Sequence, residues 1–171
     1  MPSVQQERRQ ELQRAQLREA LARWPSGVTV VTAVDRAARP WGFTASSFTS
    51  LSSSPPLVLV CLDLAAECRP VFERATAFAV HILGRDQRDL ALRFASRGVD
   101  KFSGTATARG LAGVPVLDGA SARLECTLQQ RVPGGDHVIL IGRVERVVLG
   151  GEQPLLYHRR RFHDIPAEAA S

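Results

Sequence analysis

The sequence predicts a mainly β fold of the α+β class, an antiparallel barrel or sandwich with a few added helices. At least six runs have strand character, two or three segments have helical character, and the two kinds do not alternate regularly. Regular alternation would instead predict a doubly wound parallel sheet. The length of 171 residues and the hydrophobic content of 44% fit one domain with its own core.

The N-terminal segment is predicted to be helical. Over residues 5–23, Leu17, Ala20, Leu21 and Trp24 recur at helical spacing and form one apolar stripe. Pro25 ends this helix, because the residue before a proline is disfavoured in helical conformation. Ser26-Gly27 is expected to be a turn.

The rest of the chain is predicted to be rich in strands. The strands, which carry β-branched or aromatic residues, are expected at residues 28–34, 41–48, 57–62, 78–83, 122–131 and 137–149. The strand at 57–62 is apolar on both faces and should be central. A break is expected at 52–56, a loop at 98–115, and a short mixed segment at 154–165. Short helices are expected at residues 67–75 and 86–95, the second with Asp86 as its N-cap.

Composition limits the possible partners and the compartment. Cys61, Cys68 and Cys126 form no CxxC pattern and cannot close into a complete set of bridges, so free and mostly buried thiols and a reducing cytoplasm are expected. The net charge of +5 comes from scattered arginines without a basic stripe, which disfavours nucleic acid and favours anionic small molecules. No apolar run reaches the roughly 18–20 residues of a membrane span, and no signal peptide is visible.

Common catalytic signatures are missing from the sequence. There is no GxGxxG after a strand, no GxxxxGK[ST], no GxSxG and no HExxH. The four histidines show no ligand spacing, and His158 and His163 lie in an irregular tail, so no metal site is predicted. A Rossmann nucleotide site and a P-loop are disfavoured.

Two segments are unusual, and each allows two interpretations. Residues 44–56 are rich in hydroxyls directly before an apolar strand. They are either a serine-rich hairpin loop or the polar lining for a flat ligand that approaches the backbone. Gly134-Gly135-Asp136-His137 is either a plain turn with a surface histidine or a turn that holds a neutral imidazole at the mouth of a pocket.

These two segments and several others together resemble the flavin reductase-like family of the FMN-binding split barrel. Its members are the short reductase components of two-component flavin-dependent monooxygenases. The resemblance covers about residues 17–165 and depends on pieces that occur in the family's order, namely residues 25–32, 42–48, 54–58, 78–80, 94–95, 101–102, 134–137, 141–144 and 154–157.

The resemblance implies an antiparallel split β-barrel at residues 17–165, with a polar helical extension at 1–16 and a tail at 166–171. It also implies a homodimer. We expect the second subunit to cover the strands Val28–Val34 and Leu57–Leu62, which are too apolar for solvent.

The resemblance also implies the site residues. The flavin, FMN or FAD, would contact Thr44, Ala45, Ser46, Ser47, Cys61, Leu62, Asp63, Cys68, Phe94 and Lys101. The nicotinamide of NADH or NADPH would contact Asp136, His137 and Tyr157. Phe94 and Lys101 would close over the ribityl and phosphate side. At Glu67-Cys68 the chain departs from the Ser/Thr with which many relatives reach the flavin phosphate.

The activity implied by the resemblance is NAD(P)H-dependent flavin reduction that supplies reduced flavin to a partner monooxygenase. Hydride transfer between stacked rings needs no nucleophile and no metal, which agrees with the missing signatures. No Arg pair for a 2′-phosphate is found, which favours NADH. Two alternatives remain: a non-catalytic flavin binder or an oxidase related to pyridoxamine-phosphate oxidases, and a basic protein that binds nucleic acid.

Overall fold

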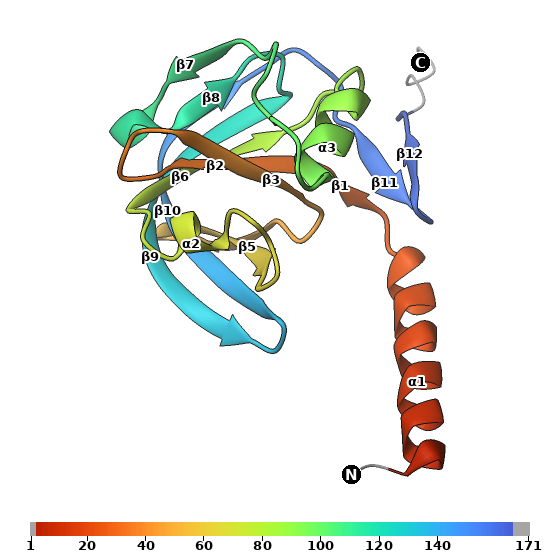
Figure 1. Cartoon of the computed structure of the whole chain (residues 1–171). Helices are drawn as coiled ribbons and strands as arrows, with labels where there is room; N and C mark the ends of the chain where they lie inside the picture. The colour runs from red at the N-terminus through yellow and green to blue at the C-terminus, as the bar shows by residue number, and fades with distance from the viewer. Residues whose placement is uncertain (1–2, 166–171) are drawn as a thin grey trace.

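The computed structural model describes residues 3–165; residues 1–2 and the predicted tail at 166–171 lie outside the described residues. The fold is mainly antiparallel β with a few helices, which confirms the predicted class (Figure 1). In chain order the elements are α1 (Val4–Ala22), β1 (Ser26–Gly27), β2 (Thr29–Val34), β3 (Pro40–Ala45), β4 (Thr49–Ser53), β5 (Pro56–Asp63), α2 (Arg69–Phe72), β6 (Ala77–Ile82), α3 (Arg88–Ala95), β7 (Thr107–Arg109), a 3₁₀ turn (Leu111–Gly113), β8 (Pro115–Leu117), β9 (Ala122–Gly134), β10 (His137–Leu149), β11 (Leu156–His158) and β12 (Arg161–His163).

The main sheet is forced to close on itself. Its seven strands have the order β3-β2-β6-β9-β10-β5-β4, so β3 and β4 are the two edges, yet only residues 46–48 separate them in the chain. Four peptide steps reach at most about 14 Å. A flat sheet with strands about 4.8 Å apart would hold these edges about 29 Å apart. The sheet therefore curls into a barrel, and we call the place where residues 46–48 join its edges the seam.

Alternate residues of the strands fill the barrel. Along β5, Val58, Val60 and Leu62 are buried, whereas the alternating Leu57 and Cys61 are half-buried, and β5 lies between β10 and β4 as a central strand should. Phe72 of α2 packs edge-on against Phe43 of β3, with ring centroids 5.1 Å apart. Helix α2 is therefore attached to the barrel through Phe72, which belongs to the core cluster.

Helix α3 covers the outside of β3 through Phe94, which is fully buried. A Cβ atom on Gly42 would lie 2.8 Å from both the Phe94 ring and the Val31 carbonyl oxygen. Position 42 therefore needs glycine for the helix to approach the strand. A second apolar cluster, separate from the barrel interior, forms around Phe94 and contains Val28, Val30, Leu83, Ala91, Leu117 and Leu155.

Several local predictions are wrong. Ser26-Gly27 is not a turn but β1, which pairs with β11 in a separate three-stranded sheet. The expected break at 52–56 is shorter, because β4 continues to Ser53 and β5 begins at Pro56. Residues 98–115 are not a plain loop, since they contain β7 and the 3₁₀ turn. These pairings depend on partners far away in the sequence, which local patterns do not reveal.

The predicted N-cap of α3 is also wrong. The helix begins at Arg88, and the residue before it is Gln87, which makes no side-chain cap. The Gln87 amide instead accepts a hydrogen bond from Gly84 N and donates one to Asp118 O. Asp86 lies outside the helix, and its carboxylate is 3.8 Å from Arg85 Nε.

His81 is a core residue whose two ring nitrogens are both satisfied in the neutral form. Nδ1 donates to Val30 O and Nε2 accepts from Leu117 N, each at 3.0 Å, so the ring links β6 to β2 and β8. Burial lowers the pKa of His81 to about 4. Glu125 is fully buried as well, and accepts hydrogen bonds from Leu111 N and Arg123 Nε.

Helix α1 buries no residue of its own and projects away from the barrel (Figure 1). The predicted stripe is exposed, since Leu17, Leu21 and Trp24 are 59%, 63% and 76% accessible. In contrast, Val30, Val31 and Ala33 of β2 are fully buried by this chain itself. The expectation that a second subunit must cover β2 is therefore wrong, because β3, β6 and the inner clusters already enclose that strand.

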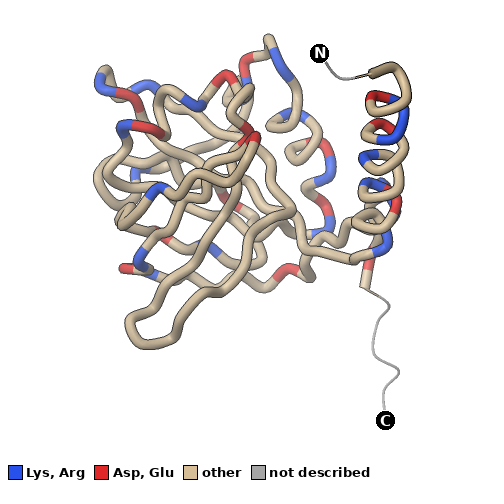
Figure 2. Tube along the Cα trace, turned by 90° about the horizontal axis from the view of Figure 1, so that it is seen from below, with Lys and Arg blue, Asp and Glu red and all other residues tan. Residues whose placement is uncertain are grey.

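Charges are mixed over the surface. Figure 2 shows Lys and Arg interspersed with Asp and Glu along α1 and around the barrel. Among residues 3–165, no helix combines the length and the apolar character needed to cross a bilayer.

Replacing Gly142 with alanine should destabilise the barrel. The added Cβ would overlap the buried ring of Phe78 and lie 2.9 Å from Cβ of Cys126. We expect Gly142→Ala to lower the free energy of unfolding by about 1–3 kcal/mol, measured by urea denaturation. Gly151→Ala is the control, because nothing lies within 4 Å of its added Cβ. Equal midpoints for the two variants would contradict this packing.

His81 should make the protein less stable as the pH falls from about 6.5 to 4. The unfolded chain binds a proton at the ordinary histidine pKa of 6.5, whereas the folded protein resists protonation until about 4. Stability is therefore complete above 6.5 and declines below it, by about 3 kcal/mol at about 1.36 kcal/mol per pKa unit. The His81→Asn variant should show a shallower decline in urea titrations over this range. An unchanged slope would assign the decline to other groups.

Candidate functional site

A hollow of about 330 Å³ lies at the seam of the barrel, a volume within the range of small-molecule pockets. The end of β3 with residues 46–48, the end of β5 with the turn before α2, the loop after α3, and the first residue of β10 form its walls. The lining residues are Phe43, Thr44, Ala45, Ser46, Ser47, Cys61, Leu62, Asp63, Ala66, Glu67, Cys68, Phe94, Ala95, Ser96, Arg97, Lys101 and His137.

The structure brings together nearly all the residues predicted from the sequence. Every residue that the resemblance assigned to a flavin lines the hollow, and so does His137. Asp136 and Tyr157 do not line it. Tyr157 lies in β11 opposite Ser26 and packs against Phe162, with ring centroids 5.4 Å apart.

Two of the three hydroxyls in residues 44–47, the segment that leads into the seam, are already engaged. Ser47 Oγ accepts from Cys61 N at 3.0 Å and is 3.3 Å from Cys61 O, so it replaces a missing strand-to-strand contact across the seam. Thr44 Oγ1 donates to Ala91 O of α3 at 2.6 Å. Ser46 is exposed, and its hydroxyl makes no hydrogen bond within residues 3–165. The Ser46 hydroxyl is therefore the one in this group that can serve a ligand directly.

Lys101 joins the end of α3 to β3. Its Nζ donates to Phe94 O at 2.9 Å and to Gly42 O at 3.2 Å. A lysine is favourable here because the last carbonyls of a helix carry partial negative charge. The Phe94 ring packs edge-on against Phe102, with centroids 5.0 Å apart. The ring is fully buried, and Phe94 borders the hollow as part of the packed cluster between α3 and the strands.

His137 is placed by its neighbours. It opens β10 opposite Asp63 of β5, and its Nδ1 is 2.7 Å from Oδ1 of Asp136. This hydrogen bond lowers the pKa of Asp136. With Nδ1 held by the carboxylate, the other ring nitrogen is left without a partner among the described residues and can bind a ligand. Asp136 thus orients His137. The backbone oxygen of Asp136 in turn accepts a hydrogen bond from Leu64 N.

The turn before α2 brings Glu67 and Cys68 to the hollow. Both carboxylate oxygens of Glu67 accept from Gly98 N, at 3.1 and 3.3 Å. Cys68 is buried, and burial raises the pKa of its thiol to about 11. Cys68 is therefore a neutral packing residue and not a thiolate. All three cysteines are free, with Cys68 and Cys126 buried and Cys61 half-buried.

Sequence reasoning missed Ser96 and Arg97, which line the hollow from the loop after α3. Their position could have indicated this, because they directly follow Phe94-Ala95, the last two residues of the helix. Arg97 adds a second positive charge beside Lys101. The negative charges on the walls are Asp63 and Glu67.

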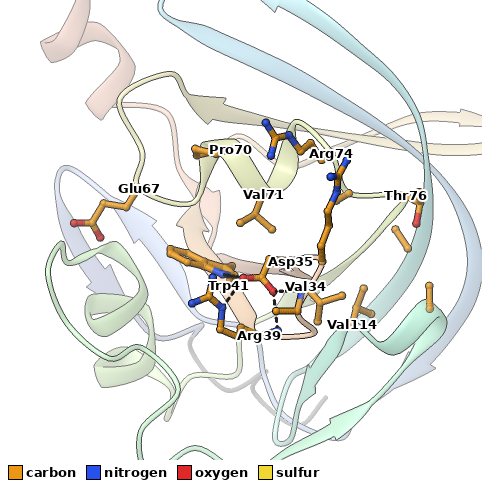
Figure 3. A pocket seen from close by; sticks show the side chains of 15 residues that line it. Val34, Asp35, Arg39, Trp41, Glu67, Pro70, Val71, Arg74, Thr76 and Val114 are labelled. Carbon is orange, nitrogen blue, oxygen red and sulfur yellow. Dashed lines mark hydrogen bonds and ion pairs between the residues drawn. The ribbon is translucent and has the colours of Figure 1, made fainter.

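A larger cleft of about 550 Å³ lies between the β2–β3 turn, α2 and the 3₁₀ turn (Figure 3). Its most connected residue is Asp35, which accepts hydrogen bonds from Arg39 and from Trp41 Nε1. Contacts with Arg39, its backbone N–H first among them, lower the pKa of Asp35 to about 2. These bonds shape the turn, and none of the predicted site residues lines this cleft. We assign the site to the smaller hollow because the predicted flavin residues and His137 line it.

The hollow offers hydrogen bonding and charge but no activated nucleophile. His137 is bonded to Asp136 and not to a serine or cysteine. Within the described residues, no three His, Cys, Asp or Glu side chains gather as metal ligands. The mixed hydroxyls, backbone groups and charges of the lining suit a polar ligand that is held by hydrogen bonds.

Comparison with known proteins points to one family. The family model described as "Flavin reductase like domain" matches residues 21–166. The actinorhodin polyketide dimerase of Streptomyces coelicolor is 50% identical over 91% of this chain and 88% of its own length. The NADH:riboflavin 5'-phosphate oxidoreductase of Streptomyces pristinaespiralis is 42% identical over 85% of each chain.

Further matches include a monooxygenase subunit and a solved structure. The flavin-dependent monooxygenase, reductase subunit HsaB, of Rhodococcus jostii is 36% identical over 86% of this chain and 76% of its own. The NADH:FAD oxidoreductase of Streptomyces globisporus, solved with NAD and FAD fragments, superimposes with a TM-score of 0.86 at 37% identity, covering 92% of this chain and 95% of that one.

The bridging role of Ser47 should be visible in stability. Ser47→Ala leaves the amide and carbonyl of Cys61 without their partner, and we expect a loss of about 1–2 kcal/mol in the free energy of unfolding. Ser46→Ala removes a neighbouring hydroxyl that bonds to nothing in the described residues and should leave stability unchanged. Urea denaturation of both variants measures the difference. Coinciding transitions would show that the seam does not depend on this hydroxyl.

Proposed function

This chain belongs to the flavin reductase-like domain family, and from that premise we propose that it reduces free flavin with NADH and supplies the product to a separate monooxygenase. The reduced nicotinamide supplies a hydride from C4 and the flavin accepts it at N5, so the protein contributes contact, orientation and electrostatics. The relatives' names, an NADH:riboflavin 5'-phosphate oxidoreductase and a reductase subunit among them, support this proposal.

One observation carries the proposal. The hollow at the seam unites polar groups from four separate segments, and every residue assigned to the flavin lines it. Its chemistry fits the ligand, because a flavin has a flat polar ring system and an anionic tail. Among the described residues the lining holds no metal-ligand set, and burial raises the pKa of the Cys68 thiol to about 11. Hydride transfer between two bound rings requires neither a metal nor a thiolate.

At the ring end of the hollow we assign the Ser46 hydroxyl and the neighbouring backbone as hydrogen-bond donors. Donors placed near N1 and C2=O of the flavin stabilise the negative charge that grows there during reduction. Thr44 and Ser47 act differently, because their hydroxyls hold α3 and β5 in place. They keep the wall rigid, which is the protein's main contribution to a reaction by proximity.

At the other end we assign Lys101 and Arg97 to the flavin phosphate. The Lys101 ammonium has three N–H donors, of which two bind Gly42 O and Phe94 O. The third can donate to a ligand. The position of the ammonium is therefore fixed before any ligand binds. FMN and FAD both carry phosphate, and the names of the relatives include both, FMN as riboflavin 5'-phosphate.

We assign His137 to the nicotinamide, with Asp136 as a positioning residue. The hydrogen bond from Nδ1 to Asp136 fixes the imidazole at the rim of the hollow. The remaining ring nitrogen can form a hydrogen bond with the carboxamide group of NADH. A contact from Tyr157 requires the dinucleotide to extend beyond the hollow toward β11.

Two features support a homodimer. Helix α1 exposes Leu17, Leu21 and Trp24, and a lone helix with no packed face is poorly stabilised in water. The edge strand β4 has no charged residue, and none occurs anywhere between Pro40 and Leu62. Uncharged edge strands are typical of surfaces that pair with another chain.

Three free cysteines fit a reducing cytoplasm.

The test of the function is NADH oxidation by the purified protein with and without added flavin. We expect the near-ultraviolet absorbance of NADH to fall only when FMN, FAD or riboflavin is present. The same assay with NADPH decides the nicotinamide preference. Flavin binding without NADH oxidation would contradict the reductase and favour a passive flavin binder.

Replacing His137 should impair the use of NADH without changing the binding of flavin. We expect His137→Ala to lower kcat/KM for NADH by about 5- to 150-fold, the cost of about 1–3 kcal/mol for one hydrogen-bonding partner. The dissociation constant of the flavin, measured by fluorescence, should stay at the wild-type value. Asp136→Asn keeps an acceptor for Nδ1 and should lose less. NADH kinetics unchanged in both variants would place the histidine outside the reaction.

A further inference from the structure

Glu67 is a negative charge inside a site that we assign to an anionic ligand. It lies between β5 and α2, is exposed, and lines the hollow together with Lys101 and Arg97. Both of its oxygens receive the N–H of Gly98, which sits in the loop after α3 with a positive φ of 68°. A backbone amide in a glycine loop next to two cations is a natural place for a phosphate oxygen.

No arginine neutralises Glu67. Figure 3 shows its carboxylate turned away from Trp41 and Arg74 of the larger cleft, although the residue borders both hollows. Within residues 3–165 it forms no ion pair, whereas the nearby Glu73 pairs with Arg69 at 2.7 Å. Lys101 and Glu67 act in opposite directions on the pKa of the Cys68 thiol, so both charges reach the same part of the hollow.

We propose that Glu67 determines flavin specificity by acting as an internal anion at the phosphate end of the hollow. It occupies the Gly98 amide and repels a phosphate group, so the ring system supplies most of the binding and a flavin without phosphate binds nearly as well as FMN. This inference rests on the proposed flavin reductase function.

The charge balance explains the effect. Lys101 has only one N–H left for a phosphate, because the other two bind carbonyl oxygens. An incoming FMN phosphate must either displace the Glu67 carboxylate from Gly98 or accept its repulsion at short range. Displacement and repulsion each reduce the binding free energy that the phosphate obtains from Lys101 and Arg97. Neither affects riboflavin, which has no phosphate and no charge.

Two variants separate repulsion from competition. Glu67→Gln removes the charge but keeps an oxygen for the Gly98 amide, and Glu67→Ala removes both. We expect FMN to bind about 2- to 5-fold more tightly to Glu67→Gln, the range for one charge contact at an exposed site, and about 10-fold more tightly to Glu67→Ala. Riboflavin should bind all proteins alike.

Flavin fluorescence titrations with riboflavin and FMN, at low and high salt, provide the measurement. The FMN gain should shrink at high salt, because screening weakens the charge effect. Glu73→Gln is the matched control, since it removes the same charge from a neighbouring residue outside the hollow, and it should change neither affinity.

The outcomes are distinct. Equal shifts for riboflavin and FMN, or no FMN gain in Glu67→Gln, would overturn the role of Glu67 while leaving the flavin reductase in place. Wild-type protein that binds neither flavin would instead overturn the proposed function. An FMN gain that Glu73→Gln reproduces would assign the effect to net charge and not to position 67.

Discussion

The short link between the two edges of the main sheet is the constraint on which the rest of the structure depends. Residues 46–48 leave too little chain for a flat sheet, so the edges must meet. Where they meet, strand pairing is incomplete, and the Ser47 hydroxyl takes over by binding both backbone groups of Cys61. The same gap leaves room for a ligand against the backbone. The same short segment thus closes the barrel and lines the hollow. This double role explains why two small hydroxyl residues, Ser46 and Ser47, stand at this point of the chain.

The surrounding elements make the seam rigid. Helix α3 is fixed to β3 three times, by the Thr44 hydroxyl, by the Lys101 ammonium and by the Phe94 ring over Gly42. Within the described residues, no buried side-chain nitrogen or oxygen lacks a hydrogen-bond partner. A reaction by proximity gains from such rigidity, because the two reacting rings need a fixed distance and no moving catalytic side chain.

The charges at the site divide it into two ends. Asp136 and His137 stand at one rim, whereas Lys101, Arg97 and Glu67 stand near the loop after α3. A protein that must release its flavin product to another enzyme has no use for very tight phosphate binding, and an internal carboxylate weakens that contact. The seam itself carries no charge, since none occurs between Pro40 and Leu62. Binding of the neutral ring system and binding of the charged tail are therefore handled by different parts of the chain.

The sequence by itself determined the fold class, the long strands and helices, and most of the residues that line the hollow, because periodicity and the order of short motifs are local properties of the chain. It identified the hydroxyl-rich segment at 44–56 and the turn before His137, and the resemblance assigned residues 44–47 of that segment to the flavin. The tertiary structure alone decided that β1 pairs with β11, that Phe94 is buried and that β2 needs no second subunit. It also decided that the Thr44 and Ser47 hydroxyls serve the scaffold, whereas that of Ser46 has no hydrogen-bond partner within residues 3–165. It also brought Arg97 and the Glu67–Gly98 contact to the hollow. These results depend on partners distant in the sequence, and a hydroxyl or a carboxylate shows whether it serves the fold or a ligand only when its partner is known.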